Sequence, residues 1–271
     1  MSTSASAPRA DAEPVIRLES VSKRFWTKDQ TVHALDRIDL DVAPGEFVSL
    51  IGPSGCGKST LLRVVGGLLE RDGGTVAVEG EEPRQAKRHK RFGFVPQAPA
   101  LLPWRSVRKN VGLLGEVNRR GADHPLLSDA ERQDLLERVG LGEFLDALPG
   151  ELSGGMQQRV SLVRAFVLGA PVLLMDEPFS ALDEITRVDM RYLLLDLWER
   201  RRTTVLFVTH SIPEAVILSD RVVVLAPRPG RVIDIVDIDL PRPRDEALED
   251  TDEFHAGVAR IRHLLREGMD R

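Results

Sequence analysis

The chain has 271 residues, of which 42% are hydrophobic and 29% are charged, and its formal net charge is −5. This length and composition fit one large α/β domain, or two smaller ones, with a sizeable hydrophobic core. The acidic balance argues against a nucleic-acid-binding surface. No apolar run is long enough to span a bilayer. The only cysteine, Cys56, excludes a disulfide framework and fits a reducing compartment.

The first segment, residues 1–13, is rich in Ser and Ala and lacks an apolar core. We therefore expect a disordered tail and not a signal peptide. Val15–Leu18 and Ile38–Val42 alternate apolar and polar residues, which predicts antiparallel strands with one exposed face. The polar stretch Trp26–His33 between them is expected to form a hairpin-like loop.

Further strands are expected wherever a short apolar run occurs. In chain order these are Phe47–Ile51, Thr75–Val78, Phe92–Pro96, Val172–Met175, Val205–Thr209 and Val222–Leu225. The last three show no polar alternation. That pattern is typical of parallel strands buried on both faces, with helices packed above and below.

Residues Gly52–Ser59 match the pattern G-x-x-x-x-G-K-[ST] of a phosphate-binding loop, between a strand and a predicted helix at Ser59–Leu69. The glycines let backbone N–H groups turn toward one point, where the helix N-terminus adds its positive dipole end. Lys58 is expected to reach the β- and γ-phosphates of a nucleoside triphosphate, and Ser59 to join a Mg²⁺ shell. The predicted nucleotide-binding residues here are Gly52, Pro53, Ser54, Gly55, Cys56, Gly57, Lys58, Ser59 and Thr60. The positive potential of the loop is also expected to lower the pKa of the Cys56 thiol.

The section from Val107 to Arg164 has a helical pattern interrupted by glycines, and it predicts a helical subdomain inserted at about residues 99–165. Ser128 and Glu131 form a predicted capping box, which opens a helix that ends at Gly140.

Two motifs follow this section. Leu152–Gln157, with the letters Leu-Ser-Gly-Gly-Met-Gln, precedes a predicted helix at Gln157–Leu168, so its amides are able to face an anion. The run Val172–Met175 then delivers Asp176 and Glu177 to the carboxyl end of a buried strand. A pair of acids that merely caps the next helix is the alternative. With a phosphate-binding loop upstream, the set resembles the signature and Walker B motifs of the ABC transporter ATPase family.

The resemblance covers nearly the whole chain after about residue 15, and it implies a role for each matched residue. Asp176 would hold Mg²⁺ through water, and Glu177 would polarise the attacking water. Gln97 resembles the Q-loop glutamine, which senses the γ-phosphate and Mg²⁺, and His210 resembles the switch histidine. The remaining implied nucleotide contacts are Ser153, Gly154, Gly155 and Gln157 of the signature, Asp183 of the D-loop Ser180–Asp183, and Phe25 against adenine.

At one position the residue that matches the family pattern is uncertain in identity, and at another the residue differs from that pattern. Trp26 is able to replace Phe25 as the ring that stacks on adenine. Ser211 stands where many relatives have Asp, and we expect Ser211 and Glu214 to form a capping box that preserves the following helix.

The resemblance implies an α/β fold, a P-loop NTPase (RecA-like) core with an antiparallel β subdomain and the inserted α-helical subdomain. The ABC ATPase domain is expected at residues 14–226, and residues 227–271 form a C-terminal extension that ends in a helix at about Glu253–Glu267.

Within the family, the interval between Lys58 and Leu152 is too short for the coiled-coil insertion of chromosome-maintenance and DNA-repair ATPases. A single cassette argues against the tandem translation factors, and the lack of a fused membrane segment argues against typical exporters. Leu101–Val111 and Leu225–Val232 are similar to segments of nitrate/sulfonate/taurine-type importers. Trp104 in the first segment is interpreted as part of a groove for a permease helix, with a core anchor as the alternative.

The resemblance thus implies an ATPase subunit of an importer for a small solute, with ATP and Mg²⁺ as cofactors. Two copies would sandwich each ATP between Gly52–Thr60 of one and Leu152–Gln157 of the other. The expected partners are integral-membrane permease subunits at the cytoplasmic face of the membrane and, indirectly, a solute-binding protein, with no nucleic acid. The alternatives are a soluble ABC ATPase that acts on nucleic acid or ribosomes, and a P-loop small-molecule kinase.

Overall fold

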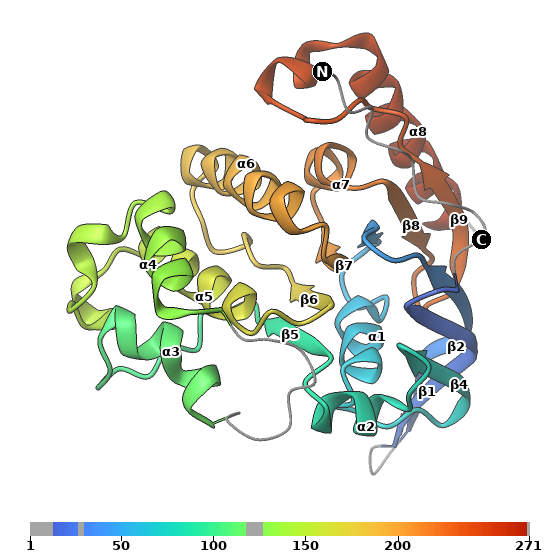
Figure 1. Cartoon of the computed structure of the whole chain (residues 1–271). Coiled ribbons are helices and arrows are strands. Elements are labelled where there is room, and N and C mark those ends of the chain that lie inside the picture. Colours follow the sequence, from blue (N-terminus) through green and yellow to red (C-terminus); the bar gives the residue numbers. More distant parts are fainter. Residues whose placement is uncertain (1–12, 27–29, 118–126, 270–271) are drawn as a thin grey trace.

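A six-stranded sheet in the order β5-β6-β7-β3-β8-β9 forms the centre of the computed structural model, which describes residues 13–26, 30–117 and 127–269 (Figure 1). Its parallel strands are β3 (Phe47–Ile51), β5 (Phe92–Val95), β6 (Val172–Asp176), β7 (Thr204–Thr209) and β8 (Arg221–Leu225). The edge strand β9 (Val232–Asp237) runs antiparallel to β8. The unbroken apolar runs therefore became parallel strands, as the lack of alternation predicted.

The two faces of this sheet bury two separate hydrophobic clusters. Phe47 and Ile51 of β3 belong to the cluster that includes Trp198 and Phe207. Their neighbours in β3, Val48 and Leu50, belong to the other cluster, because successive side chains of a strand point to opposite faces. The helix α1 (Lys58–Val65) contributes Leu61 and Leu62 to this second cluster.

The second cluster also takes in a three-stranded antiparallel sheet in the order β2-β1-β4. Its strands are β1 (Ile16–Trp26), β2 (Thr31–Val42) and β4 (Gly73–Val78), so β1 and β2 extend into the expected loop Trp26–His33, of which residues 27–29 lie outside the described residues. Register shifts after Leu18, Val21 and Lys23 interrupt the alternation in β1. These irregularities hid the length of both strands from the sequence pattern.

The inserted helices lie on the opposite side of the molecule from the small sheet (Figure 1). They are α3 (Val107–Val117), α4 (Asp129–Arg138) and α5 (Gly154–Val167). The capping box that opens α4 is confirmed: the Glu131 amide donates to Ser128 Oγ at 3.3 Å, and the Ser128 amide donates to Glu131 Oε2 at 2.8 Å. The helix α5 begins at Gly154, earlier than expected, because Ser153 caps it by accepting from the Met156 amide.

Of the remaining helices, α2 packs against β4 of the small sheet, the others pack around the parallel sheet, and the last of them belongs to the C-terminal segment. They are α2 (Pro83–Arg88), α6 (Glu184–Arg201), α7 (Ile212–Leu218) and α8 (Asp252–Met269). The expected helix near the C-terminus is thus present as α8, whereas the sequence did not predict β9. Because β9 pairs with β8, the large sheet continues past the expected boundary at residue 226.

Arg244 fixes the C-terminal segment to the rest of the chain. It is 5% exposed, and its guanidinium donates to the carbonyl oxygens of Val216, Ile217 and Ser219 at the end of α7, at 3.2, 3.0 and 2.7 Å. Burial lowers the pKa of Arg244 to about 9. The cation compensates for this burial by pairing with carbonyl groups that the helix leaves free.

Cys56, in the connection between β3 and α1, has no exposed surface and belongs to the second cluster. Burial raises the pKa of its thiol, and the opposing attraction of the Lys58 ammonium is smaller. The expectation of a lowered pKa is therefore wrong: removal from water disfavours the thiolate more than the nearby charge favours it.

A buried thiol of raised pKa should react slowly. We predict that iodoacetamide labels Cys56 of the native protein at least about tenfold more slowly at neutral pH than Cys56 of the denatured chain. Mass spectrometry of timed samples measures this, with guanidinium-unfolded protein as the reference. Rapid, complete labelling of the folded chain would contradict it.

Candidate functional site

The connection from β3 to α1 forms a tight loop whose glycines are required by its backbone and its surroundings. Gly55 and Gly57 have φ angles of +77° and +98°. A Cβ added at Gly57 would lie 2.7 Å from the carbonyl oxygen of Ala34, and one added at Gly52 would lie 2.8 Å from that of Leu225. Only glycine fits these positions without displacing a neighbour.

The side chain of Lys58 returns into this loop. It is 5% exposed, and Nζ donates to the carbonyl oxygens of Gly52 at 2.8 Å and Pro53 at 3.1 Å. The ammonium group thus lies inside the loop, at the N-terminus of α1, where an anion would meet both the charge and the free amides of the helix.

Ser59 and Asp176 come together from α1 and the carboxyl end of β6. Ser59 Oγ donates to Asp176 Oδ1 at 2.6 Å, and Asp176 is 4% exposed. A hydroxyl and a carboxylate beside a phosphate-binding loop suit Mg²⁺, which usually takes one or two carboxylates and otherwise water and phosphate oxygens. Arg63 Nη2 lies 3.7 Å from Asp176 Oδ2, and sequence reasoning gave it no role. Its position four residues after Ser59 on α1 was the available signal.

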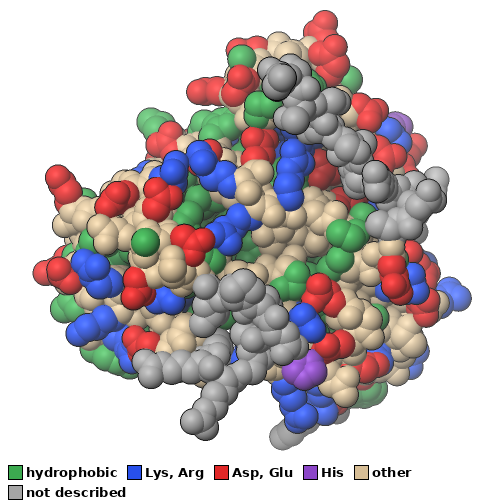
Figure 2. All heavy atoms as spheres, viewed as in Figure 1, with side chains coloured by type: hydrophobic (Ala, Val, Ile, Leu, Met, Phe, Trp, Pro, Cys, Tyr) green, Lys and Arg blue, Asp and Glu red, His purple; other side chains and the backbone are tan. Residues whose placement is uncertain are grey.

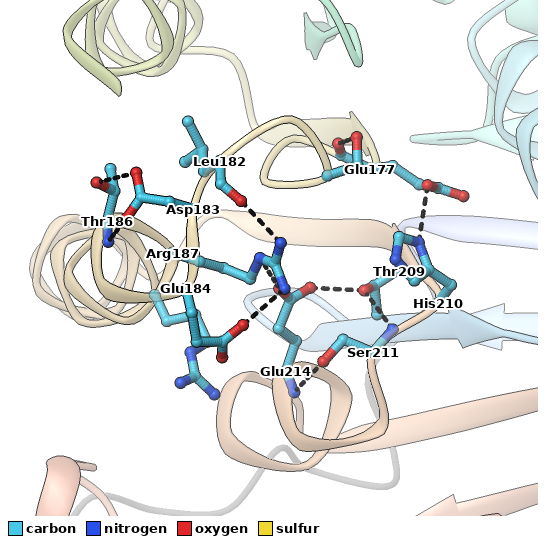
Figure 3. A network of polar contacts seen from close by, with 12 residues as sticks. Glu177, Leu182, Asp183, Glu184, Thr186, Arg187, Thr209, His210, Ser211 and Glu214 are labelled. Atoms are coloured by element: carbon cyan, nitrogen blue, oxygen red, sulfur yellow. Dashed lines mark hydrogen bonds and ion pairs between the residues drawn. The ribbon is translucent and has the colours of Figure 1, made fainter. Parts of the chain in front are cut away.

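Glu177 and His210 form the second pair, at the ends of β6 and β7 (Figure 3). Glu177 Oε2 lies 2.9 Å from His210 Nδ1. Glu177 has a φ of +45°, and its amide donates to the carbonyl oxygen of Val208 at 3.0 Å. A non-glycine residue held in the left-handed region is a strained feature that often marks a functional site. The structure therefore brings the two expected hydrolytic residues into direct contact.

Gln97 reaches the same region through Ser180. Gln97 Nε2 donates to Ser180 Oγ at 3.1 Å, and Ser180 Oγ donates to the carbonyl oxygen of Glu177 at 3.0 Å. Sequence reasoning placed Ser180 in the D-loop but assigned it no contact. The signal that was available is its position three residues after Glu177.

The signature residues lie apart from the loop. Across the described residues, no hydrogen bond joins Leu152–Gln157 to Gly52–Thr60. Gln157 donates to the carbonyl oxygens of Pro149 and Leu152, at 3.0 and 3.3 Å. A Cβ added at Gly155 would lie 2.7 Å from Thr186 Cγ2, so the start of α5 adjoins the start of α6.

Asp183 caps the start of α6 by accepting from the Thr186 amide at 3.0 Å. This backbone hydrogen bond lowers the pKa of the Asp183 carboxyl.

The two rings that could stack on adenine lie at the end of β1. Phe25 and Trp26 are 39% and 66% exposed, and Lys23 Nζ lies 5.6 Å from the centre of the Phe25 ring. Both rings are accessible for stacking, and the choice between them stays open.

The turn after β8 backs the phosphate-binding loop and was not predicted to do so. The Gly230 amide donates to the carbonyl oxygen of Ala34 at 3.0 Å. A Cβ added at Gly230 would lie 2.1 Å from the carbonyl oxygen of Cys56. Arg228 Nε donates to the carbonyl oxygen of Gly55 at 3.4 Å. The importer-like run Leu225–Val232 thus packs against the loop.

In the part of the chain that the structure describes, no helix is long and apolar enough to cross a membrane. On the face shown in Figure 2, acidic and basic side chains are interspersed over the surface.

Known proteins share both the sequence and the fold of this chain. A sequence model of the ABC transporter family matches residues 35–180. A putative ATP-binding protein of Brucella abortus is 48% identical over 239 residues, which cover 86% of this chain and 87% of the relative. An aliphatic sulfonates import ATP-binding protein of Xanthomonas axonopodis pv. citri is 48% identical over 231 residues, which cover 85% of this chain and 88% of the relative.

Among solved structures, a dimeric post-hydrolysis state of the ATP-binding cassette MJ0796, bound to ADP and Pi, matches with a TM-score of 0.72 and 32% identity. The match covers 83% of this chain and 100% of that one. The cbiO1 subunit of Clostridium perfringens matches with a TM-score of 0.70 and 26% identity, over 94% of this chain and 99% of that one. With the expected fold confirmed and its motifs in place, the chain belongs to the ABC transporter family, as an ATP-binding subunit.

Proposed function

We propose that this subunit hydrolyses ATP to energise the uptake of a small solute, of the nitrate, sulfonate or taurine type, through a separate permease. The observation that carries the hydrolytic part is the convergence of Lys58, the Ser59–Asp176 pair and the Glu177–His210 pair at one edge of the sheet. The names of relatives that import aliphatic sulfonates support the solute class.

The residues fit a nucleotide with its metal. Lys58 and the amides at the start of α1 would bind the phosphates, and Ser59, Asp176 and Gln97 would hold Mg²⁺. When bound, Mg²⁺ supplies positive charge that offsets the charge developing on the phosphate oxygens. Glu177 orients and deprotonates the attacking water, and His210 fixes the Glu177 carboxylate through their 2.9 Å contact. Positioning and charge stabilisation thus account for most of the catalysis.

A second copy of the chain completes the site in this proposal. Within one copy the signature residues Ser153, Gly154, Gly155 and Gln157 lie apart from the loop, while the N-terminus of α5 and the exposed Ser153 hydroxyl offer donors for phosphate. The dimeric ATP-binding cassettes among the structural relatives support this arrangement. Each ATP would then hold two copies together until hydrolysis removes the γ-phosphate.

We propose that permease subunits bind near Trp104 and hold the chain at the cytoplasmic face of the membrane. Trp104 is 72% exposed, although Trp is a residue that usually buries much of its surface. The neighbouring Leu102 amide donates to Asn110 Oδ1 at 2.8 Å, and Asn110 is fully buried, so a fixed backbone presents the ring. An exposed indole on a rigid frame suits a groove for a helix of a partner. A solute-binding protein on the far side of the membrane would choose the solute.

The role of Glu177 is testable by removing its charge. We predict that Glu177→Gln lowers kcat at least about a hundredfold and retains ATP binding, because the base acts on water and not on nucleotide affinity. The variant should also form an ATP-dependent dimer on gel filtration. The matched control is Glu253→Gln, an exposed acid at the start of α8, which should keep the wild-type rate. A Glu177→Gln variant that hydrolyses ATP at the wild-type rate would contradict the assignment of Glu177 as the base.

The metal site is testable at Ser59. We predict that Ser59→Ala raises the Mg²⁺ concentration for half-maximal ATPase activity by about tenfold or more, because an oxygen ligand is lost. Ser59→Thr keeps the hydroxyl and should restore the wild-type Mg²⁺ requirement. Titration of MgCl₂ at fixed ATP measures both, and equal requirements for Ala and Thr would refute the assignment.

The docking surface is testable at Trp104. We predict that Trp104→Ala keeps the ATPase rate of the isolated subunit within about twofold and loses at least about tenfold in affinity for its permease in detergent. Met269→Ala, at an exposed apolar residue at the end of α8, far from α3 in Figure 1, is the control and should bind normally. Wild-type permease affinity of the Trp104 variant would exclude this ring as an anchor.

A further inference from the structure

The D-loop and the segment that carries His210 are joined by a pair of charged side chains that the proposed function does not use. The D-loop Ser180–Asp183 precedes α6, and His210 directly follows β7 (Figure 3). Arg187, on the first turns of α6, lies between the D-loop and Glu214 on α7 (Figure 3). Sequence reasoning treated Glu214 only as half of a capping box.

Glu214 holds the backbone on both sides of His210. It is 5% exposed, and its Oε2 accepts from Thr209 Oγ1 at 2.6 Å. Thr209 Oγ1 in turn accepts from the Ser211 amide at 3.0 Å. The Glu214 amide donates to Ser211 Oγ at 3.4 Å, so the cap forms, but the carboxylate turns to Thr209 and the expected box stays half-made. Glu214 therefore fixes the residues before and after the histidine.

Arg187 holds the D-loop and faces Glu214 with the same planar group. Its Nη2 donates to the carbonyl oxygen of Leu182 at 2.8 Å, and its Nη1 donates to Glu184 Oε2 at 3.0 Å. Its Nε lies 3.9 Å from Glu214 Oε1. Among the described residues this buried Nε has no hydrogen-bond partner. A charge-assisted hydrogen bond needs about 2.8 Å, so a shift of about 1 Å between α6 and α7 would form one.

The carboxylate of Glu214 is costly in this place. Burial raises its pKa, and the hydrogen bond from Thr209 and the charges of Arg191, Arg187 and His210 oppose the rise. An apolar side chain of similar size would avoid the desolvation cost. The cost of burying this carboxylate, together with its contacts, indicates that Glu214 serves to hold its neighbours in position.

We propose that Arg187 and Glu214 are positioning residues that couple the D-loop Ser180–Asp183 to His210. When a second copy contacts the D-loop, the displacement reaches Arg187 through the Leu182 carbonyl and closes the Arg187–Glu214 contact. The closed contact holds Glu214 in place and, through Thr209, keeps His210 in the 2.9 Å contact with Glu177 that the single chain already makes. The inference rests on the proposed function, because that function has a second copy complete the site and gives His210 a role in hydrolysis.

The test is a double-mutant cycle on the full chain with Arg187→Gln and Glu214→Gln, since each substitution removes one charge and leaves a polar side chain in its place. Each single variant should lower kcat about tenfold and leave the Kd for a fluorescent ATP analogue within about twofold, because neither side chain touches nucleotide. The double variant should be no slower than the slower single variant, because the pair acts as a unit.

Controls separate positioning from stability. The exposed pair Asp196 and Arg200 on the same helix is joined at 3.0 Å, and Asp196→Asn with Arg200→Gln should leave kcat unchanged. Thr209→Val should reproduce the loss in Glu214→Gln, whereas Thr209→Ser keeps the hydroxyl and should rescue it. Thermal midpoints of all variants are measured alongside.

Three results would overturn the coupling: wild-type kcat in both single variants, strictly additive losses, or losses in kcat and ATP affinity that follow the thermal midpoints. If the wild-type chain failed to hydrolyse ATP at all, the proposed function would fail first and the inference with it. If the wild-type protein hydrolyses ATP and the variants keep its kcat, the inference is refuted while the proposed function stands.

Discussion

The parallel register of four central strands is the constraint on which the candidate site depends. Ile51 pairs with Thr209, and Asp176 pairs with Val208, so the ends of β3, β6 and β7 reach one level at one edge of the sheet. Ile51 also pairs with Val224, which brings the turn after β8 to the same edge. A slip of one residue in any pair would turn its side chains to the opposite face. Apolar burial on both faces thus sets the position of every polar group beyond the strands.

How far the sequence predicted the fold depended on how regular each element is. The strand β3 was predicted to the residue because all five of its side chains are buried and the pattern has no gap. The extents of β1 and β2 were wrong because bulges break the period of two. The edge strand β9 was missed because most of its side chains are half-buried, and such a strand shows neither a clean alternation nor a continuous apolar run.

The residues of the candidate site also differ in how well the sequence predicted them. Residues inside contiguous motifs, such as Lys58 and Asp176, were predictable because the motif itself encodes the local geometry. Arg63 and Arg187 were missed because Asp176 and Glu214, the acids that they face, come near them only on folding. Ser180 was missed although its partner Glu177 is only three residues away. The sign of the Cys56 shift was also beyond the sequence, because it depends on how completely the packed core removes water from the thiol.

Apolar contacts and polar contacts stabilise different parts of this structure. The strands that carry the catalytic groups are locked by close-packed side chains, which resist small displacements. The segments that we propose respond to a partner are joined by side-chain hydrogen bonds instead: Gln97 to Ser180, and Arg187 to the Leu182 carbonyl. The neutral bond from Gln97 contributes about 1 kcal/mol and the charged one from Arg187 about 2 kcal/mol, so each is able to re-form at modest cost. In the proposed coupling, a rigid sheet with polar contacts at its edge would let a movement at the interface reposition His210 without disturbing the core.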